Sequence, residues 1–328
     1  MNLKFRVSKL ANFFFFISNL SEWHFSCRKA YNEAWLRATG SLTVREKAIL
    51  RQLSTVLQKY GFITKGGKAA HPGAFYLTLP ERRAQSAVQK LVTKEEYKIL
   101  EASFSTLKNR FEKWWHVCIS DMDRIRMFKE ALRERGALEL FRNVENVLGK
   151  PPSGAAITVI ALFSPLGVTE TAAGGANAGS YTVTIELPRI RPGTWQCKYS
   201  VGILAHEICH ALLNKSMLRT LMCIIRTFRA TSHGNLVSLV MEAVVSSFVP
   251  VGYLGQRYAP RHFGEIAFSR IHRAYQLSPT KGYDAFRTSV IIASWKLYPL
   301  AAEYGMRKKK LDRRFLLEAI REITKQRG

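Results

Sequence analysis

The residues with the clearest chemical potential are His206, Glu207 and His210, which form an HExxH motif within an apolar stretch. Residues four apart lie on one face of a helix, so the two imidazoles can point at one centre, as a tetrahedral zinc ion requires. The carboxylate of Glu207 can then reach a zinc-bound water and act as a general base without being a ligand. The motif therefore predicts a zinc site with a hydrolytic base.

The same motif has a structural interpretation, in which hydrogen bonds satisfy both histidines of a buried helix. With eight histidines in the chain, a chance HExxH is expected about once in a hundred such sequences. We therefore favour the metal site. Cys209, inside the motif, lies about 100° around the helix from His210, so we interpret it as a buried structural thiol.

A catalytic zinc usually takes three protein ligands, so a third must come from outside the motif. Glu242 is the only charged residue in the run LVSLVMEAVVSSFV from Leu236 to Val249. A carboxylate is costly to bury alone, so it should meet a metal or, in the alternative, a lysine or arginine. We expect Glu242 to be the third ligand. The rival candidates, in order, are His233, Glu265 and His262.

Two helices must position these ligands, and we expect them near Val201–Leu213 and Leu236–Val249. For the first, Ser200 is a plausible N-cap and Asn214 a plausible end; for the second, the corresponding residues are Asn235 or Ser232, and Pro250. The link of about twenty residues allows the second helix to return antiparallel beside the first.

The first 150 residues predict a mainly helical region. Thr43-x-x-Glu46 and Thr93-x-x-Glu96 are capping boxes that open amphipathic helices. Pro151–Gly154 breaks the pattern, which places a soft domain boundary between residues 1–150 and 151–328, although the first region could share the core of the second.

The second region predicts a small sheet followed by helices, so the fold class is α+β. Its expected strands are Ala156–Phe163 and Tyr181–Leu187, the latter alternating like a half-buried strand. Beyond the two helices that carry the site, we expect helices near His262–Gln276, Tyr283–Tyr298 and Leu311–Thr324.

An HExxH followed some thirty residues later by a glutamate on a second apolar helix resembles the gluzincin zinc peptidases. The resemblance covers about fifty residues and implies a zincin-like domain in which His206, His210 and Glu242 bind Zn²⁺ and Glu207 activates water. It also implies an edge strand that pairs with an extended peptide substrate, and Tyr181–Leu187 is similarly placed. Residues 243–245 lack the acidic residue that many gluzincins use to orient a ligand histidine, which leaves that supporting contact unassigned.

The resemblance implies a metallopeptidase that cleaves peptide bonds with metal-activated water, or a related amide hydrolase. The developing oxyanion needs a donor. Tyr253, Tyr258 and His262 are candidates by position, and Asn177, in a Gly-rich loop, is a candidate for the cleft wall.

The charge balance supports a second hypothesis. Fifty Lys and Arg against twenty-four Asp and Glu give a formal charge of +26, with one dense run, RKKKLDRR, at Arg307–Arg314. Such a charge attracts nucleic acid, anionic membranes or acidic proteins. The alternative function is therefore a basic nucleic-acid-binding or regulatory protein with a structural or inactive HExxH site. A third is a noncatalytic toxin or interaction module built on the peptidase fold.

Cysteine content and hydropathy bear on the cellular compartment of the protein. Five cysteines without CxxC pairs indicate neither a disulfide framework nor a cysteine zinc site. The apolar N-terminal run Phe13–Ile17 is short and lacks a cleavage site, so we interpret it as part of the fold. The longest apolar stretch, Leu236–Leu254, contains Glu242 and Pro250, and we expect no transmembrane segment. These features predict a cytoplasmic protein; its oligomeric state stays open.

Overall fold

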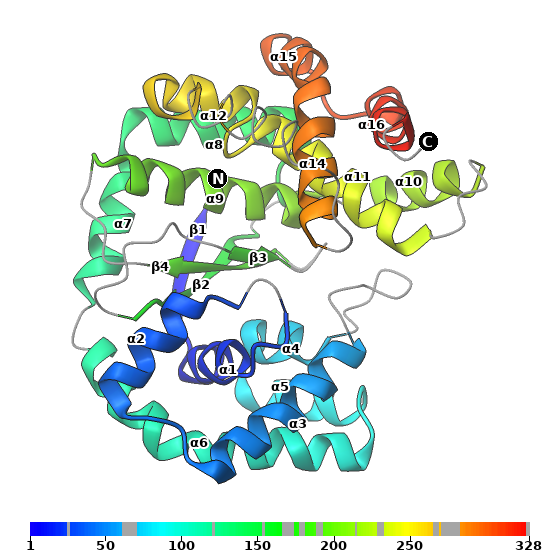
Figure 1. Cartoon of the computed structure of the whole chain (residues 1–328). Coiled ribbons are helices and arrows are strands. Elements are labelled where there is room, and N and C mark those ends of the chain that lie inside the picture. The colour runs from blue at the N-terminus through cyan, green and yellow to red at the C-terminus, as the bar shows by residue number, and fades with distance from the viewer. Residues whose placement is uncertain are drawn as a thin grey trace.

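A small β-sheet lies between two groups of helices in the computed structural model (Figure 1). The structure describes residues 1–24, 27–60, 71–119, 122–152, 155–165, 174–176, 181–187, 193–213, 215–227, 233–264, 269 and 283–325. The sheet contains β1 (Leu3–Val7), β2 (Ile157–Phe163), β4 (Thr182–Leu187) and β3 (Gly174–Ala176), in that spatial order. The first three are parallel, and β3 runs antiparallel to β4.

Helices dominate the rest of the described chain, so the expected α+β class is confirmed at that level. Before the second strand they are α1 (Lys9–Leu20), α2 (Lys29–Thr39), α3 (Val44–Tyr60), α4 (Pro72–Thr78), α5 (Glu81–Gln89), α6 (Lys94–Ile119), α7 (Asp123–Arg133) and α8 (Arg135–Leu148). After the sheet they are α9 (Trp195–Leu212), α10 (Lys215–Thr227), α11 (His233–Phe248), α12 (Tyr253–Tyr258), α14 (Tyr283–Lys296), α15 (Tyr298–Met306) and α16 (Arg313–Lys325).

Both expected capping boxes are confirmed. The backbone N–H of Thr43 donates to the Glu46 carboxylate at 2.8 Å, and the N–H of Glu46 donates to the Thr43 hydroxyl at 3.2 Å. Thr93 and Glu96 make the same reciprocal pair at the start of α6. Each box satisfies two backbone donors that a helix start leaves without partners.

The strand β4 corrects two expectations. It pairs with β2 on one side and β3 on the other, so it is not the edge strand; β3 occupies that position. Its residues from Val183 to Leu187 are buried on both faces, because α9 packs against one face of the sheet and α1 and α4 lie on the other (Figure 1). The half-buried alternation was therefore wrong for this strand.

The N-terminal segment belongs to the sheet and the core. β1 pairs in parallel with β2, from Leu3 opposite Ile157 to Val7 opposite Ala161. The amide of Asn12, on α1, donates to the Ala161 carbonyl at 3.0 Å, and its oxygen accepts from the N–H of Phe163 at 2.8 Å. One apolar core runs through the strands and the helices on both sides of residue 150, so the two regions share packing; the boundary between them stays a prediction.

Leu236–Tyr258 is long and apolar enough, by length and composition alone, to cross a membrane. In this structure 72% of its most apolar window is buried inside the protein, and a core helix of a soluble protein passes the same test. The expectations of no transmembrane segment and of a cytoplasmic location stay predictions.

A buried arginine closes the carboxyl ends of β2 and β4. Nη1 of Arg124 donates to the carbonyls of Ser164 at 2.9 Å and Leu187 at 3.1 Å, and its guanidinium lies over the ring of Phe163. Only 3% of Arg124 is exposed. Since α7 carries Arg124, this contact ties the helical N-terminal region to the strand that leads toward α9.

We predict that Arg124→Met destabilises the fold by about 3 kcal/mol, because two buried carbonyls lose a charged donor. Urea unfolding monitored by circular dichroism measures the change. The matched control is Arg126→Met on the exposed side of the same helix, for which we expect a change within about 0.5 kcal/mol. Equal effects of the two substitutions would contradict the role assigned to Arg124.

Candidate metal centre

The HExxH motif lies in the second half of α9, which begins six residues earlier than expected. Thr194, not Ser200, is the N-cap, and its hydroxyl accepts from the N–H of Cys197 at 3.3 Å. Ser200 lies inside the helix and bonds to the Gln196 carbonyl. α9 ends at Leu212, and the expected end residue Asn214 lies outside the described residues. The earlier start lengthens the buried helix that packs against the sheet and does not change the register of the motif.

The second helix, α11, starts at His233 and ends at Phe248, just before Pro250. Asn235 therefore lies inside the helix, and Ser232 lies outside the described residues. α11 packs against α9, with Val249 near His206 and Glu242 near His210, which is the order of antiparallel neighbours. The expected antiparallel return is thus present, with α10 in the connection.

Three ligand-type side chains meet where the two helices touch. Nε2 of His206 lies 3.3 Å from Oε2 of Glu242, Nε2 of His210 lies 3.2 Å from Oε1 of Glu242, and the two Nε2 atoms are 3.1 Å apart. Ligands about 2.0–2.1 Å from a tetrahedral zinc are separated by about 3.3 Å. These closest distances, which run to two different oxygens of Glu242, are compatible with one zinc ion among the three side chains. The three residues form a group of described residues that could hold a metal.

The protonation pattern of His206 also fits a metal. Its Nδ1 lies 3.1 Å from the Val249 carbonyl, which can only accept a hydrogen bond, so Nδ1 carries the proton. In the neutral ring Nε2 then presents a lone pair to the carboxylate of Glu242. Two acceptors face each other at this distance only if a proton or a cation lies between them, and a carbonyl partner on the other nitrogen is the usual support of a zinc-bound histidine.

The pKa values of His206 and Glu242 indicate how the cluster binds a proton when no metal cation is present. Burial alone would lower the pKa of His206, but the hydrogen bond and charge of Glu242 outweigh it and raise the pKa to about 9. For Glu242, burial would raise the pKa, but the two histidines hold it well below its usual range. The cluster thus stabilises positive charge at its centre, which is the requirement for a cation site.

The centre is buried on the α9 side and open on the α11 side. The side chains of His206 and His210 are 12% and 14% exposed, whereas that of Glu242 is 37% exposed. A catalytic zinc site keeps one position for water or substrate, in contrast to a closed structural site. The partial exposure of Glu242 is consistent with such an open position.

Glu207 lies next to the cluster and directly against the edge strand β3. Only 8% of it is exposed, and burial raises the pKa of its carboxyl. An ideal Cβ built on Gly174 of β3 would lie 2.5 Å from Cγ of Glu207 and 2.8 Å from the Thr184 carbonyl. A side chain at position 174 would therefore displace Glu207 or the strand, and glycine lets β3 pass directly over the acidic side chain.

A second close approach, between Gly202 and Pro250, positions the backbone carbonyl that supports His206. An ideal Cβ on Gly202 would lie 2.8 Å from Cβ of Pro250, so glycine in α9 admits the turn that follows α11. That turn carries Val249, whose carbonyl accepts from His206. Residues 243–245 offer no acidic side chain for this task, and the backbone carbonyl could not be predicted because no side-chain pattern encodes one.

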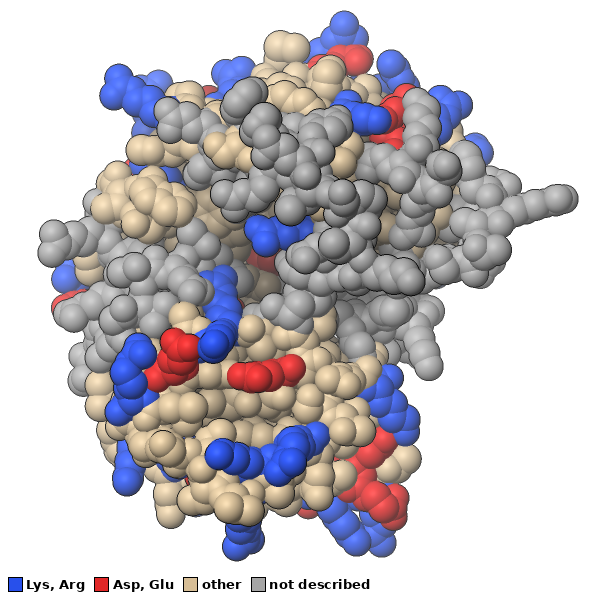
Figure 2. Space-filling view, viewed as in Figure 1, with Lys and Arg blue, Asp and Glu red and all other residues tan. Residues whose placement is uncertain are grey.

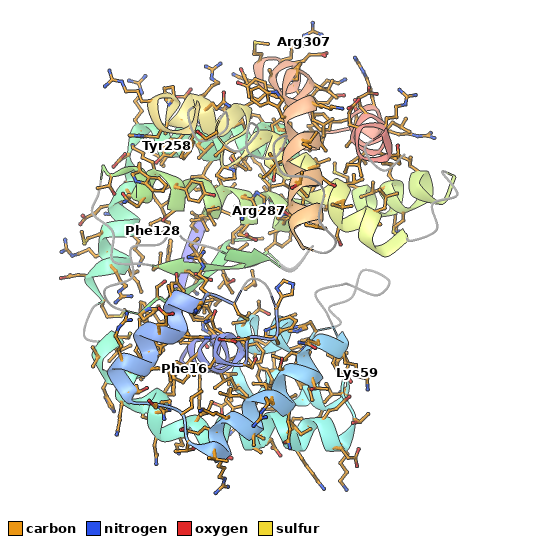
Figure 3. The ribbon with its side chains drawn as sticks, viewed as in Figure 1. Phe16, Lys59, Phe128, Tyr258, Arg287 and Arg307 are labelled. Carbon is orange, nitrogen blue, oxygen red and sulfur yellow. The ribbon has the colours of Figure 1, made fainter. Side chains whose placement is uncertain are left out.

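The other sequence candidates do not join the cluster. His262 is exposed, and the side chain of His233 and the whole of Glu265 and Asn177 lie outside the described residues. The hydroxyl of Tyr253 accepts from Arg257 at 3.0 Å. Tyr258 packs against Lys198 and Phe263 and lies above α9 in Figure 3, on the side away from the sheet. The oxyanion donor therefore stays unassigned. Cys209, 1% exposed, is buried as expected.

The surface near β3 is hollowed between the two helical groups, as the space-filling view shows (Figure 2). In Figure 3, Arg287 of α14 lies between α9 and β3 in the same region. Its side chain is exposed, so a cation is available at this face of the molecule.

The chain was compared with protein-family models, with curated proteins and with solved structures, and nothing matches in any of the three comparisons. The interpretation of the site therefore depends on its own geometry.

We predict near-stoichiometric zinc in the purified protein, measured by elemental mass spectrometry. His206→Ala and Glu242→Ala should each lose the metal, since two remaining ligands do not hold zinc tightly. Cys209→Ala is the control in the same helix and should retain it. If the wild-type protein takes up no zinc after reconstitution, the metal site is refuted; if Glu242→Ala keeps the metal, the third ligand is wrong.

Proposed function

We propose that the chain is a zinc-dependent hydrolase of zincin-like fold that cleaves peptide bonds, with His206, His210 and Glu242 as ligands and Glu207 as base. The observation that supports this most is the convergence of two imidazoles and a carboxylate at tetrahedral spacing, next to a buried glutamate that is not part of the cluster.

The edge strand supports a peptide as substrate. β3 is the last strand of the sheet and pairs with β4 alone among the described strands. An extended peptide can add to such an edge through backbone hydrogen bonds, and Gly174 brings this edge against Glu207. A substrate strand beside β3 would place its backbone carbonyls next to the base and the ligand cluster.

The residues of the chain divide the chemistry between them. A zinc ion held by His206, His210 and Glu242 would act as a Lewis acid that lowers the pKa of water and polarises a carbonyl. Glu207 accepts the proton of the attacking water and donates it to the leaving amine nitrogen. The Val249 carbonyl holds the His206 ring in the tautomer that keeps Nε2 free. Because Glu207 is buried, bulk water has little access to the proton on its carboxyl group.

We predict that Glu207→Gln lowers peptide cleavage by about 10²–10⁴-fold, the contribution of a general base, while zinc content stays unchanged. A peptide-library screen by mass spectrometry identifies a substrate, and the rate of the variant is then compared with that of wild type. Cleavage by Glu207→Gln at the wild-type rate would contradict the mechanism, and no cleavage of any peptide by zinc-loaded wild type would contradict the proposed activity.

A second prediction concerns the close approach of β3. Gly174→Ala should retain zinc but lower cleavage by on the order of 100-fold, since about 1 Å of misplacement in a catalytic group has that effect. Gly264→Ala is the matched control, because an added Cβ there meets nothing within 4 Å. Equal rates for the two variants would show that β3 does not position Glu207.

A further inference from the structure

A second cavity, of about 550 Å³, lies on the side of α9 away from the sheet, where α8, α12 and α15 meet (Figure 1). Five basic residues and a single acidic one, Glu139, are among the residues that line it. The basic residues are Arg133, Arg135, Arg142, Arg257 and Lys308. The charge of the cavity is therefore strongly positive, and neither the proposed metal ligands nor Glu207 lines it.

These cations are available to a ligand. All five are exposed, and among the residues that the structure describes, Arg133, Arg135, Arg142 and Lys308 form no ion pair. Arg257 donates to the hydroxyl of Tyr253, a neutral partner. Five like charges with one counter-charge, Glu139, repel one another, so the arrangement favours an anion that neutralises several of them together.

The cavity continues into the basic run that the sequence contains. Lys308 belongs both to the cavity lining and to the run Arg307–Arg314. Within that run Arg307 pairs with Glu303 and Lys309 with Asp312, whereas Lys310, Arg313 and Arg314 are exposed and form no ion pair with described residues. In Figure 3, Arg307 marks the outer end of α15, on the same side of the molecule. The positive surface is thus longer than one small anion needs.

The chemistry of the lining distinguishes between polyanions. Four of the five cavity cations are arginines, whose planar guanidinium binds phosphate or carboxylate oxygens in a bidentate manner and so favours an oxyanion over other ligands. Leu138 and Met306, 53% and 65% exposed, stand among them and offer apolar contact to flat bases or sugars. A flat membrane surface does not fill a concave cavity, so a flexible polyanion fits the lining better, and an acidic peptide is the competing ligand that the test includes.

We propose that this cavity and the adjoining run bind the phosphate backbone of single-stranded nucleic acid. A single strand presents one charge per nucleotide, and its flexible backbone can follow a positively charged groove. Binding of this kind is largely independent of base sequence and weakens steeply as salt rises. It requires neither a metal nor Glu207, so it is independent of the proposed hydrolysis.

The test is fluorescence anisotropy of a labelled 15-nucleotide oligo-dT with the full chain, titrated at several salt concentrations. Arg135→Glu/Arg142→Glu should weaken binding by at least about tenfold and reduce the steepness of the salt dependence, because two phosphate contacts are lost. The matched control is Arg82→Glu/Arg83→Glu, an equal charge change at two exposed positions of α5, which should stay within about twofold of wild type.

Three results would overturn the proposal. They are no binding of the oligonucleotide at low salt, an equal loss in both double variants, and displacement of the oligonucleotide by poly-glutamate or anionic phosphatidylserine vesicles at equal charge concentration. The second result would mean that the diffuse charge of the chain attracts nucleic acid without a site. Thermal melting followed by circular dichroism checks that both variants remain folded, and Lys308→Glu provides an independent third position in the cavity.

Discussion

The contact between Glu242 and the two histidines of α9 is the interaction on which the candidate site depends. Two imidazole nitrogens and two carboxylate oxygens lie within about one hydrogen-bond length of one another, a grouping that is unfavourable unless a proton or a cation neutralises it. The fold must hold these atoms together against that repulsion, and it does so by packing two apolar helices along their length. Gly202 and Pro250 set the distance between the helices, and the chain reversal at Val249 supplies the carbonyl that orients His206.

The sheet explains why the N-terminal region is needed near this site. The strand β4 leads to the α9 side of the molecule, and it is held by β2, which in turn pairs with β1 at the start of the chain. Asn12 of α1 bonds to the backbone of β2, and Arg124 of α7 bonds to the Leu187 carbonyl at the end of β4. Close to the same strand ends, the hydroxyl of Tyr31 donates to the Glu186 carboxylate at 2.9 Å. The position of β3 over Glu207 therefore depends on contacts made by residues far away in sequence.

The basic surface of the chain and its candidate metal centre lie on different helices. The proposed metal ligands and the proposed base lie on α9 and α11, in contact with the core, whereas the dense basic surface lies across α8, α12 and α15. The helix α9 lies between the candidate metal centre and the basic cavity, because it packs against the sheet and also against α8. Attraction of a polyanion to one side therefore leaves the other side open to a different ligand.

The sequence by itself determined the local features. HExxH spacing, the apolar helix around Glu242, and the two capping boxes depend on residues within a few turns of one another, so periodicity and residue type were enough to predict them. The sequence could not decide which strand forms the edge, because both faces and both sides of β4 are covered by elements distant in sequence. Nor could it identify the carbonyl of Val249, the close approach at Gly174, or the cavity that joins Arg135 to Lys308, since backbone groups and long-range neighbours leave no periodic signal. Tertiary packing decided these, because only the arrangement of α9, α11 and the sheet determines which backbone atoms and which charges meet.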